Sequence, residues 1–163
     1  MVSGHAGSDT LWETWSPWTS IFPGRWAAYC WAEAQSAAAV PAFVLSAEVL
    51  GVRPTAPGFA EFEVSPQGGG LAWAEGVVPT PQGGIGVRWE KTADRYTLQV
   101  TVPKAGRGVL HLPPAGNYTI DKEPLGTDRL KRLPGGSVAI FVEEGTHFLV
   151  AEGLTSPEGK SLP

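Results

Sequence analysis

Apolar and polar residues alternate with a period of two along most of the chain after residue 58. Glycine or proline separates nearly every pair of alternating runs, in PQGGG, TPQGG, KAG, PPAG and LPGG. Such runs, bounded by turn residues, are typical of strands with one buried face. We therefore predict an antiparallel β-sandwich over about ninety residues, with about seven or eight short strands. The runs are AEFEV, LAWAEGVV, IGVRW, YTLQVTV, GVLHL, SVAIFV and THFLVA.

The alternation also predicts which strand positions face the core. In YTLQVTV, Tyr96 and every second residue after it are apolar, which indicates one face on the core and one in water. Trp73 and Trp89, which lie in two other runs, are expected in the core as well, because large flat side chains bury much apolar area.

The first part of the chain has a different pattern. The stretch from residue 25 to Gly51 is rich in alanine and places apolar residues at helical spacing. Because Pro41 removes an N–H and clashes with the preceding turn, we predict one helix near 25–38 and another near 41–50. Gly51 is predicted to end the second helix as the residue that follows its last turn.

The turn-rich segment GVRPTAPGF follows this helical part and marks the predicted domain boundary. The predicted divisions are helices in 1–58, the β-sandwich in 59–152 and a flexible tail in 153–163. The fold class is mainly β, with an antiparallel sandwich preceded by two or three helices.

Composition and charge narrow the classes of function. The 163 residues are 42% apolar and 17% charged, which is a globular composition. The formal charge is −4 and the basic residues are scattered, so we expect no nucleic acid as a partner. The single Cys30 excludes an internal disulfide and a cysteine-based zinc site. No run is long enough to span a bilayer and no signal peptide is visible, so the default expectation is a cytoplasmic protein without a membrane partner.

The main candidate for chemistry is Glu13, which lies in the stretch TLWETWSPW. Five of the seven tryptophans surround it in sequence: Trp12, Trp15, Trp18, Trp26 and Trp31. Indole rings stack on sugar rings, and a carboxyl group desolvated among them is suited to proton transfer. The alternative is that these tryptophans fill the junction between helices and sandwich, and composition alone leaves both interpretations open.

The other polar candidates are weaker. Asp9 is interpreted as a helix N-cap or turn residue, and Glu33 and Glu48 as residues on solvated helix faces. His111 and His147 lie in separate strands and neither has metal-ligand spacing with another ligand residue. The glycine-rich stretches lack the Lys and Ser/Thr of a phosphate-binding loop. We expect no cofactor and no metal.

These segments together resemble one known family. TLWETW, then PAFVLSAEVLGVRPTAPGFAEFEVSP, LAWAEGVVPTPQGGIGVRWE and YTLQVTVP are similar to the C-terminal end of bacterial α-L-rhamnosidases of glycoside hydrolase family 78, from about residue 7 to about residue 113. The resemblance implies an (α/α)6 catalytic barrel followed by a C-terminal antiparallel β-sandwich. This chain would then hold the last barrel helices, in about residues 1–51, and the whole sandwich.

The resemblance also implies roles for individual residues. The family inverts the anomeric centre with one general acid and one general base, and the base lies in a motif that matches Thr10, Trp12 and Glu13. Glu13 is thus the general base position, and the acid has no counterpart in these residues. Trp12, Trp15, Trp18 and Gln35 are the implied substrate-binding positions. Gln35 is a departure, because many members have histidine there, and Ala37 stands where they have tryptophan.

Two hypotheses follow from these observations. In the first, the chain is a fragment or truncated member of the α-L-rhamnosidase family that is inactive alone, its substrate class being a rhamnose-containing glycoside. In the second, it is a non-catalytic sandwich that binds carbohydrate or packs against a separately encoded barrel. Helices cut from a barrel expose apolar faces, so self-association or association with the missing barrel is expected.

Overall fold

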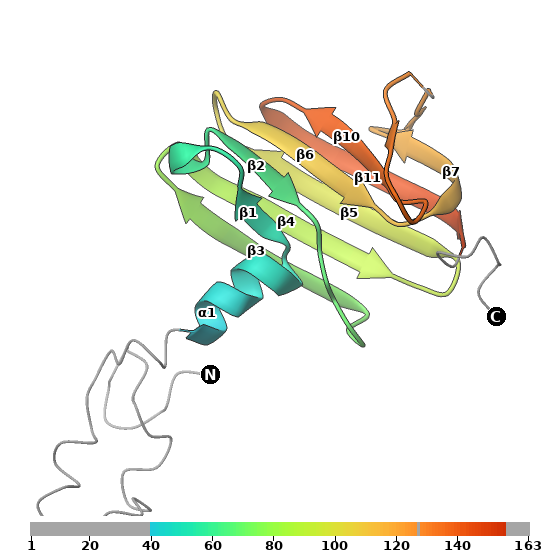
Figure 1. Ribbon diagram of the computed structural model, residues 1–163, viewed down its shortest axis with the longest axis horizontal. Coiled ribbons are helices and arrows are strands. Elements are labelled where there is room, and N and C mark those ends of the chain that lie inside the picture. Colours follow the sequence, from blue (N-terminus) through green and yellow to red (C-terminus); the bar gives the residue numbers. More distant parts are fainter. Residues whose placement is uncertain (1–39, 127, 156–163) are drawn as a thin grey trace, which may run out of the picture. The chain divides into compact units, whose positions relative to one another are not determined.

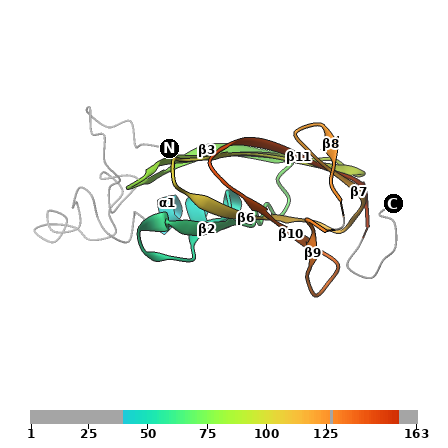
Figure 2. The same ribbon diagram turned by 90° about the horizontal axis from the view of Figure 1, so that it is seen from above.

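The computed structural model describes residues 40–126 and 128–155. Within these residues the protein is a β-sandwich, shown from two directions in Figures 1 and 2. Both sheets lie in one compact unit that begins at Leu45, and the short helix α1 (Val40–Val44) precedes that unit in the chain. The predicted mainly-β fold is confirmed.

The first sheet has five strands in the order β1-β2-β6-β10-β9. All of its pairs are antiparallel except β2 with β6, which is parallel. The strands are β1 (Val52–Pro54), β2 (Glu61–Val64), β6 (Arg107–Leu112), β10 (Val138–Val142) and β9 (Lys131–Arg132). A 3-10 turn, η5 (Pro57–Phe59), connects β1 to β2.

The second sheet has six strands in the order β3-β4-β5-β11-β7-β8, and every pair in it is antiparallel. The strands are β3 (Trp73–Thr80), β4 (Gly83–Lys91), β5 (Arg95–Val102), β11 (Gly145–Leu154), β7 (Ala115–Ile120) and β8 (Glu123–Pro124). Figure 2 shows the two sheets as separate layers.

The core lies between the sheets and is built by the predicted alternation. Leu98 and Val100 of β5 are fully buried, and Tyr96 and Val102 nearly so. The largest fully buried side chains come from both sheets, and include Phe62, Leu110, Ile140, Ile85, Leu98 and Leu149. Burial of apolar area at about 25 cal/mol per Å² makes this cluster the main source of stability.

The seven runs that alternate in the sequence all form strands. Four strands lie outside those runs: β1, β7, β8 and β9. The sandwich accordingly extends from Val52 to Leu154, beyond both predicted limits of 59 and 152, because β1 pairs with β2 and the end of β11 pairs with β7. The predicted helix near 25–38 and the tail residues 156–163 lie outside the described residues.

The segment that enters the sandwich is fixed by backbone hydrogen bonds. Residues Leu45–Val49 form a π-helical turn, η4, in place of the predicted continuous α-helix. The carbonyl of Val49 accepts a hydrogen bond of 2.8 Å from the indole Nε1–H of Trp89. Gly51 then ends the helical part with φ of 75°, and its carbonyl accepts from the Ser65 N–H at 2.9 Å. The predicted role of Gly51 is therefore confirmed.

Candidate functional site

The residues that the sequence singles out for catalysis and sugar binding lie outside the described part of the chain. They are Glu13, Trp12, Trp15, Trp18 and Gln35, all within residues 1–39. Their roles stay predictions. The described residues nevertheless contain a surface with the side chains of a binding site, on the outer face of the six-stranded sheet.

Strand register places four outward side chains in one row across this sheet. Phe148 of β11 lies opposite Gln99 of β5, Gln99 lies opposite Arg88 of β4, and Arg88 lies opposite Glu75 of β3. Neighbouring strands are about 4.8 Å apart, so the row extends over about 14 Å. An aromatic ring, an amide, a guanidinium and a carboxylate therefore follow one another in a line.

The surface is hollowed along this row. One hollow of about 340 Å³ is lined by Phe148, Gln99 and Arg88, together with Glu90, Thr92, Arg95 and Thr97. A second hollow of about 210 Å³ shares Gln99 and Arg88 and continues over Gly86 to Val77. We call the two hollows together the sheet-face groove.

Charges in the sheet-face groove are paired but remain accessible. Arg88 Nη1 lies 2.6 Å from Glu75 Oε2, and both side chains are more than half exposed. Arg95 Nε lies 3.7 Å from Glu152 Oε1 at a second exposed pair. Because exposed ion pairs contribute at most about 1 kcal/mol to stability, these groups are free to exchange partners with a ligand.

Trp73 lies on the same outer face, and its predicted place in the core is wrong. Its side chain is 61% exposed, whereas Trp89 and Tyr96 are buried as predicted. In β3 the inward positions are Ala74 and Val78, and Trp73 shares its face with Glu75. The sequence contains a signal for this: Glu75 is charged and lies two residues after Trp73, so both side chains lie on the same, solvent-facing side of the strand.

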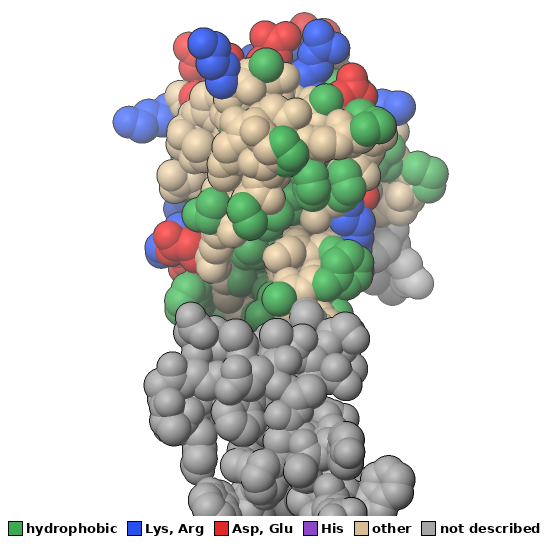
Figure 3. Space-filling model, turned by 90° about the vertical axis from the view of Figure 1, so that its left-hand side faces the viewer, with side chains coloured by type: hydrophobic (Ala, Val, Ile, Leu, Met, Phe, Trp, Pro, Cys, Tyr) green, Lys and Arg blue, Asp and Glu red, His purple; other side chains and the backbone are tan. Residues whose placement is uncertain are grey.

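Together these side chains combine exposed aromatic rings with hydrogen-bonding and charged groups. Trp73 stands opposite Glu90, whose side chain lines the first hollow, and Phe148 lines that hollow from β11. Aromatic rings contact the apolar face of a sugar, while amide, guanidinium and carboxylate groups bond to its hydroxyls. The row could not be read from the sequence, because it depends on the pairing register of four strands. Figure 3, which views the left-hand side of Figure 1 and does not face this sheet, shows that hydrophobic side chains are also exposed among polar ones there.

The five-stranded sheet carries a chain of ion pairs on its outer face. Arg53 Nη2 lies 2.6 Å from Glu48 Oε2, and Arg53 Nη1 lies 3.7 Å from Glu63 Oε1. Glu63 in turn lies 3.5 Å from His111 Nε2. The hydrogen bond from Arg53 to Glu48 raises the pKa of the guanidinium further above its ordinary value. Glu48 is thus tied to the sheet by Arg53.

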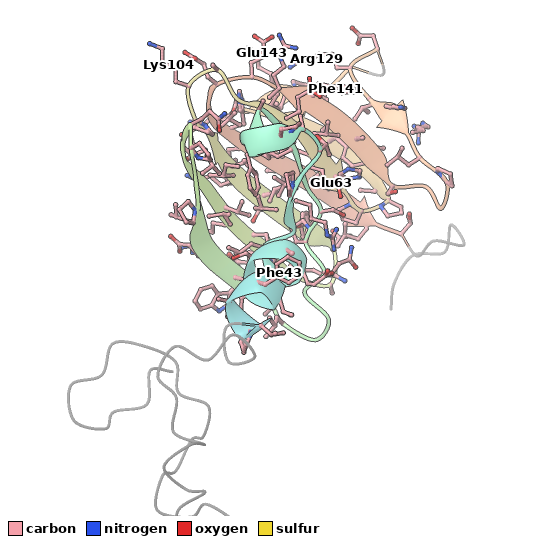
Figure 4. The ribbon with its side chains drawn as sticks, turned by 60° about the vertical axis from the view of Figure 1, so that its left-hand side comes forward. Phe43, Glu63, Lys104, Arg129, Phe141 and Glu143 are labelled. Atoms are coloured by element: carbon pink, nitrogen blue, oxygen red, sulfur yellow. The ribbon has the colours of Figure 1, made fainter. Side chains whose placement is uncertain are left out.

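These ion pairs link η4, β1, β2 and β6 to one another, so they hold neighbouring elements of the fold together. Figure 4 shows Glu63 on this sheet, together with Phe141 of β10. His147 is likewise held by neighbours, with Nδ1 3.2 Å from Asp121 Oδ2 and Nε2 3.1 Å from the Glu143 carbonyl. Both histidines therefore have a carboxylate neighbour within the sandwich.

Residues 40–126 and 128–155 contain no group of three or more His, Cys, Asp or Glu side chains placed to hold a metal ion. Among the helices of that same part, none has the length and apolar character needed to cross a membrane.

Comparison with known proteins agrees with the resemblance of the sequence. Residues 51–125 match the family model described as the bacterial alpha-L-rhamnosidase C-terminal domain. A curated alpha-L-rhamnosidase from Alteromonas sp. (strain LOR) is 48% identical over 56 residues, which are 34% of this chain and 6% of that protein.

Solved structures show the same fold. An alpha-L-rhamnosidase from Dictyoglumus thermophilum matches with a TM-score of 0.68 and 21% identity, over 87% of this chain and 16% of that one. The Streptomyces avermitilis alpha-L-rhamnosidase, solved with L-rhamnose, matches with a TM-score of 0.65 and 19% identity, over 87% of this chain and 14% of that one. This chain therefore spans a small part of the length of each relative that it matches.

Proposed function

We propose that this chain, whose residues 51–125 belong to the bacterial alpha-L-rhamnosidase C-terminal domain family, works as the C-terminal part of an α-L-rhamnosidase. The family match carries this proposal. In it, the sandwich supports the last helices of a catalytic barrel, and Glu13 is the general base. The substrate is a terminal α-L-rhamnoside.

The chemistry requires two carboxyl groups on opposite sides of the glycosidic bond. In inverting hydrolysis the acid protonates the leaving oxygen, while the base takes a proton from the water that attacks the anomeric carbon. The two groups are then about 6.5–9.5 Å apart, which leaves room for that water. Glu13 serves as the base, and a preceding part of the barrel supplies the acid.

The sandwich contributes a rigid anchor in this proposal. The Val49 carbonyl at the end of η4 is held by the Trp89 indole, and Gly51 is held by Ser65. Glu48 is held by Arg53 at 2.6 Å. The end of η4 is therefore held at the start of the sandwich by three separate contacts.

An assay with an aryl α-L-rhamnoside tests the proposal. We expect no measurable release of rhamnose by the isolated chain, and turnover when the chain is joined or mixed with a barrel polypeptide encoded directly upstream. Glu13→Gln should then abolish turnover, whereas Glu33→Gln, on a predicted solvated helix face, should not. Turnover by the isolated chain that Glu13→Gln abolishes would contradict the requirement for a barrel.

A second candidate function is carbohydrate binding by the sandwich itself. It is favoured by the exposure of Trp73 beside the sheet-face groove. Titration with rhamnose and with neutral rhamnosides, followed by tryptophan fluorescence, should show saturable binding that Trp73→Ala weakens. Phe141→Ala, on the other sheet, is the matched control. A titration without any binding would exclude this function.

A further inference from the structure

A pocket lies between the two sheets at one end of the sandwich, apart from the sheet-face groove. Its volume is about 350 Å³, which is within the usual range for small-molecule sites. The loop after β2 (65–71) forms one wall, and the ends of β4 and β6, the start of β5 and Ser137 form the rest. We call this hollow the end pocket.

Two stacked aromatic residues line the end pocket. The rings of Trp89 and Tyr96 have centroids 6.4 Å apart and planes inclined by 18°. The loop passes directly over Trp89, because a Cβ added at Gly68 would lie 2.2 Å from the indole ring. The Trp89 N–H is already used by the Val49 carbonyl.

The Tyr96 hydroxyl has no such partner. Tyr96 is only 6% exposed, and within the described residues its hydroxyl makes no hydrogen bond. The second buried tyrosine, Tyr118, has its hydroxyl bonded both to the Pro113 carbonyl and to the Ala115 N–H. Among the described residues, Gln82 Oε1 is the only fully buried side-chain polar atom without a partner, so the Tyr96 hydroxyl keeps some exposure. Because Tyr96 lines the end pocket, this hydroxyl offers a donor to a molecule bound there.

The end pocket has basic side chains in its lining. Lys91 and His111 line the end pocket, and none of the described residues that line it is acidic. Lys91 forms no ion pair with any described residue, while His111 Nε2 is 3.5 Å from Glu63. Hydroxyl groups of Ser65 and Ser137 and the amide of Gln67 complete the lining.

We propose that the end pocket binds a sugar acid, a single hydroxylated ring that carries a carboxylate. Lys91 pairs with the carboxylate, and the Tyr96 hydroxyl donates to an oxygen of the ligand. The serine hydroxyls and the Gln67 amide serve the ring hydroxyls, and Leu112 and Pro113 contact its apolar edge. This site uses neither Glu13 nor the sheet-face groove, so it is independent of rhamnoside hydrolysis.

Calorimetric titration of the full chain with glucuronate and galacturonate, and with glucose and rhamnose as neutral probes, tests the site. We expect a uronate to bind and the neutral sugars to bind at least about tenfold more weakly, because a hydrogen bond to a charged group is stronger than one between neutral groups. Lys91→Gln should weaken uronate binding about tenfold, and Lys91→Arg should retain most of it. Tyr96→Phe keeps the stacked ring and should weaken binding about three- to tenfold.

Lys104→Gln is the matched control, because Lys104 lies in the turn between β5 and β6, at the opposite end of these strands (Figure 4). Its binding should equal that of the unmodified chain. The proposal is overturned if no uronate binds at 20 mM, a concentration on the order of those used for weak sugar sites. It is also overturned if Lys91→Gln and Tyr96→Phe bind as the unmodified chain does, or if only Trp73→Ala removes binding, which would place the ligand on the sheet face.

Discussion

At the scale of single residues, the two buried tyrosines Tyr118 and Tyr96 differ in whether the hydroxyl group makes hydrogen bonds, and mutation can test this difference. The Tyr118 hydroxyl donates to the Pro113 carbonyl at 3.0 Å and accepts from the Ala115 N–H at 2.8 Å, which fixes the turn between β6 and β7. Tyr118→Phe should lower the free energy of unfolding by about 1–3 kcal/mol, because it leaves two backbone groups without their partner. Urea denaturation measures this value.

Tyr96→Phe is the natural control for that measurement, because the Tyr96 hydroxyl has no partner among the described residues. Its unfolding free energy should change by less than about 0.5 kcal/mol. If the two variants lose equal stability, the hydrogen bonds of Tyr118 are not what stabilises the turn.

A second effect at the residue scale concerns acid stability. Burial, the largest single influence on Asp121, acts to raise its pKa, but hydrogen bonds from the Phe148 N–H and His147, with the charges of His147 and Arg129, outweigh it. The pKa of Asp121 is therefore lowered in the folded state. Its contribution is present above the unfolded pKa of about 3.9 and is lost as the pH falls through the lower folded value.

We therefore expect the unfolding free energy to fall below about pH 4 more steeply in the unmodified chain than in Asp121→Asn. Asparagine keeps an oxygen that accepts from the Phe148 N–H but does not titrate in this range. The difference should be small, because the Asp121 side chain is 48% exposed and solvent screens its pairs. Parallel slopes between pH 5 and pH 2 would contradict this assignment.

At the scale of elements, the sequence predicts strands where both periodicity and length are present. Long alternating runs such as YTLQVTV became β5, with the predicted residues buried. The strand β7 was not predicted, since its first residues, Ala115 and Gly116, belong to the PPAG stretch that reads as a turn. Its strand conformation depends on pairing with β11 and β8. The sheet-face groove and the end pocket could not be predicted, because both arise from side chains of strands far apart in sequence.

The junction before β1 gives a sharp test at this scale. Gly51 has φ of 75°, and a Cβ added there would lie 2.2 Å from the carbonyl carbon of Ser65. Gly51→Ala should therefore lower the unfolding free energy by more than about 2 kcal/mol, since strain and overlap act together.

Gly70→Ala is the corresponding control, because no atom lies within 4 Å of a Cβ added at Gly70. It should be neutral or slightly stabilising, since alanine reduces the entropy of the unfolded chain. Thermal unfolding followed by circular dichroism compares the two. Equal melting temperatures would mean that the junction adapts and does not fix the end of η4.

At the scale of the whole molecule, the β3 edge of the six-stranded sheet is the feature of the described surface that bears on association. The strand β3 begins the order of the six-stranded sheet, so one of its edges has no neighbouring strand among the described residues. The side chains of Trp73 and Val77 point outward from the face of the sheet, and Val77 is 69% exposed. An exposed edge strand with apolar side chains is a template for pairing with another chain.

We therefore expect the isolated chain to self-associate, with a weight-average mass that rises with concentration in sedimentation equilibrium. Val77→Lys should reduce this rise, because a charge on an edge strand opposes edge-to-edge pairing. Phe148→Lys is the control: Phe148 is 40% exposed, but β11 lies between β5 and β7, and the Phe148 carbonyl accepts a hydrogen bond from the Asp121 N–H directly after β7. Equal effects of the two changes would indicate general hydrophobic contact, and a monomer at every concentration would exclude association of this kind. If Val77→Lys alone restores the monomer, the β3 edge is the surface that a partner covers.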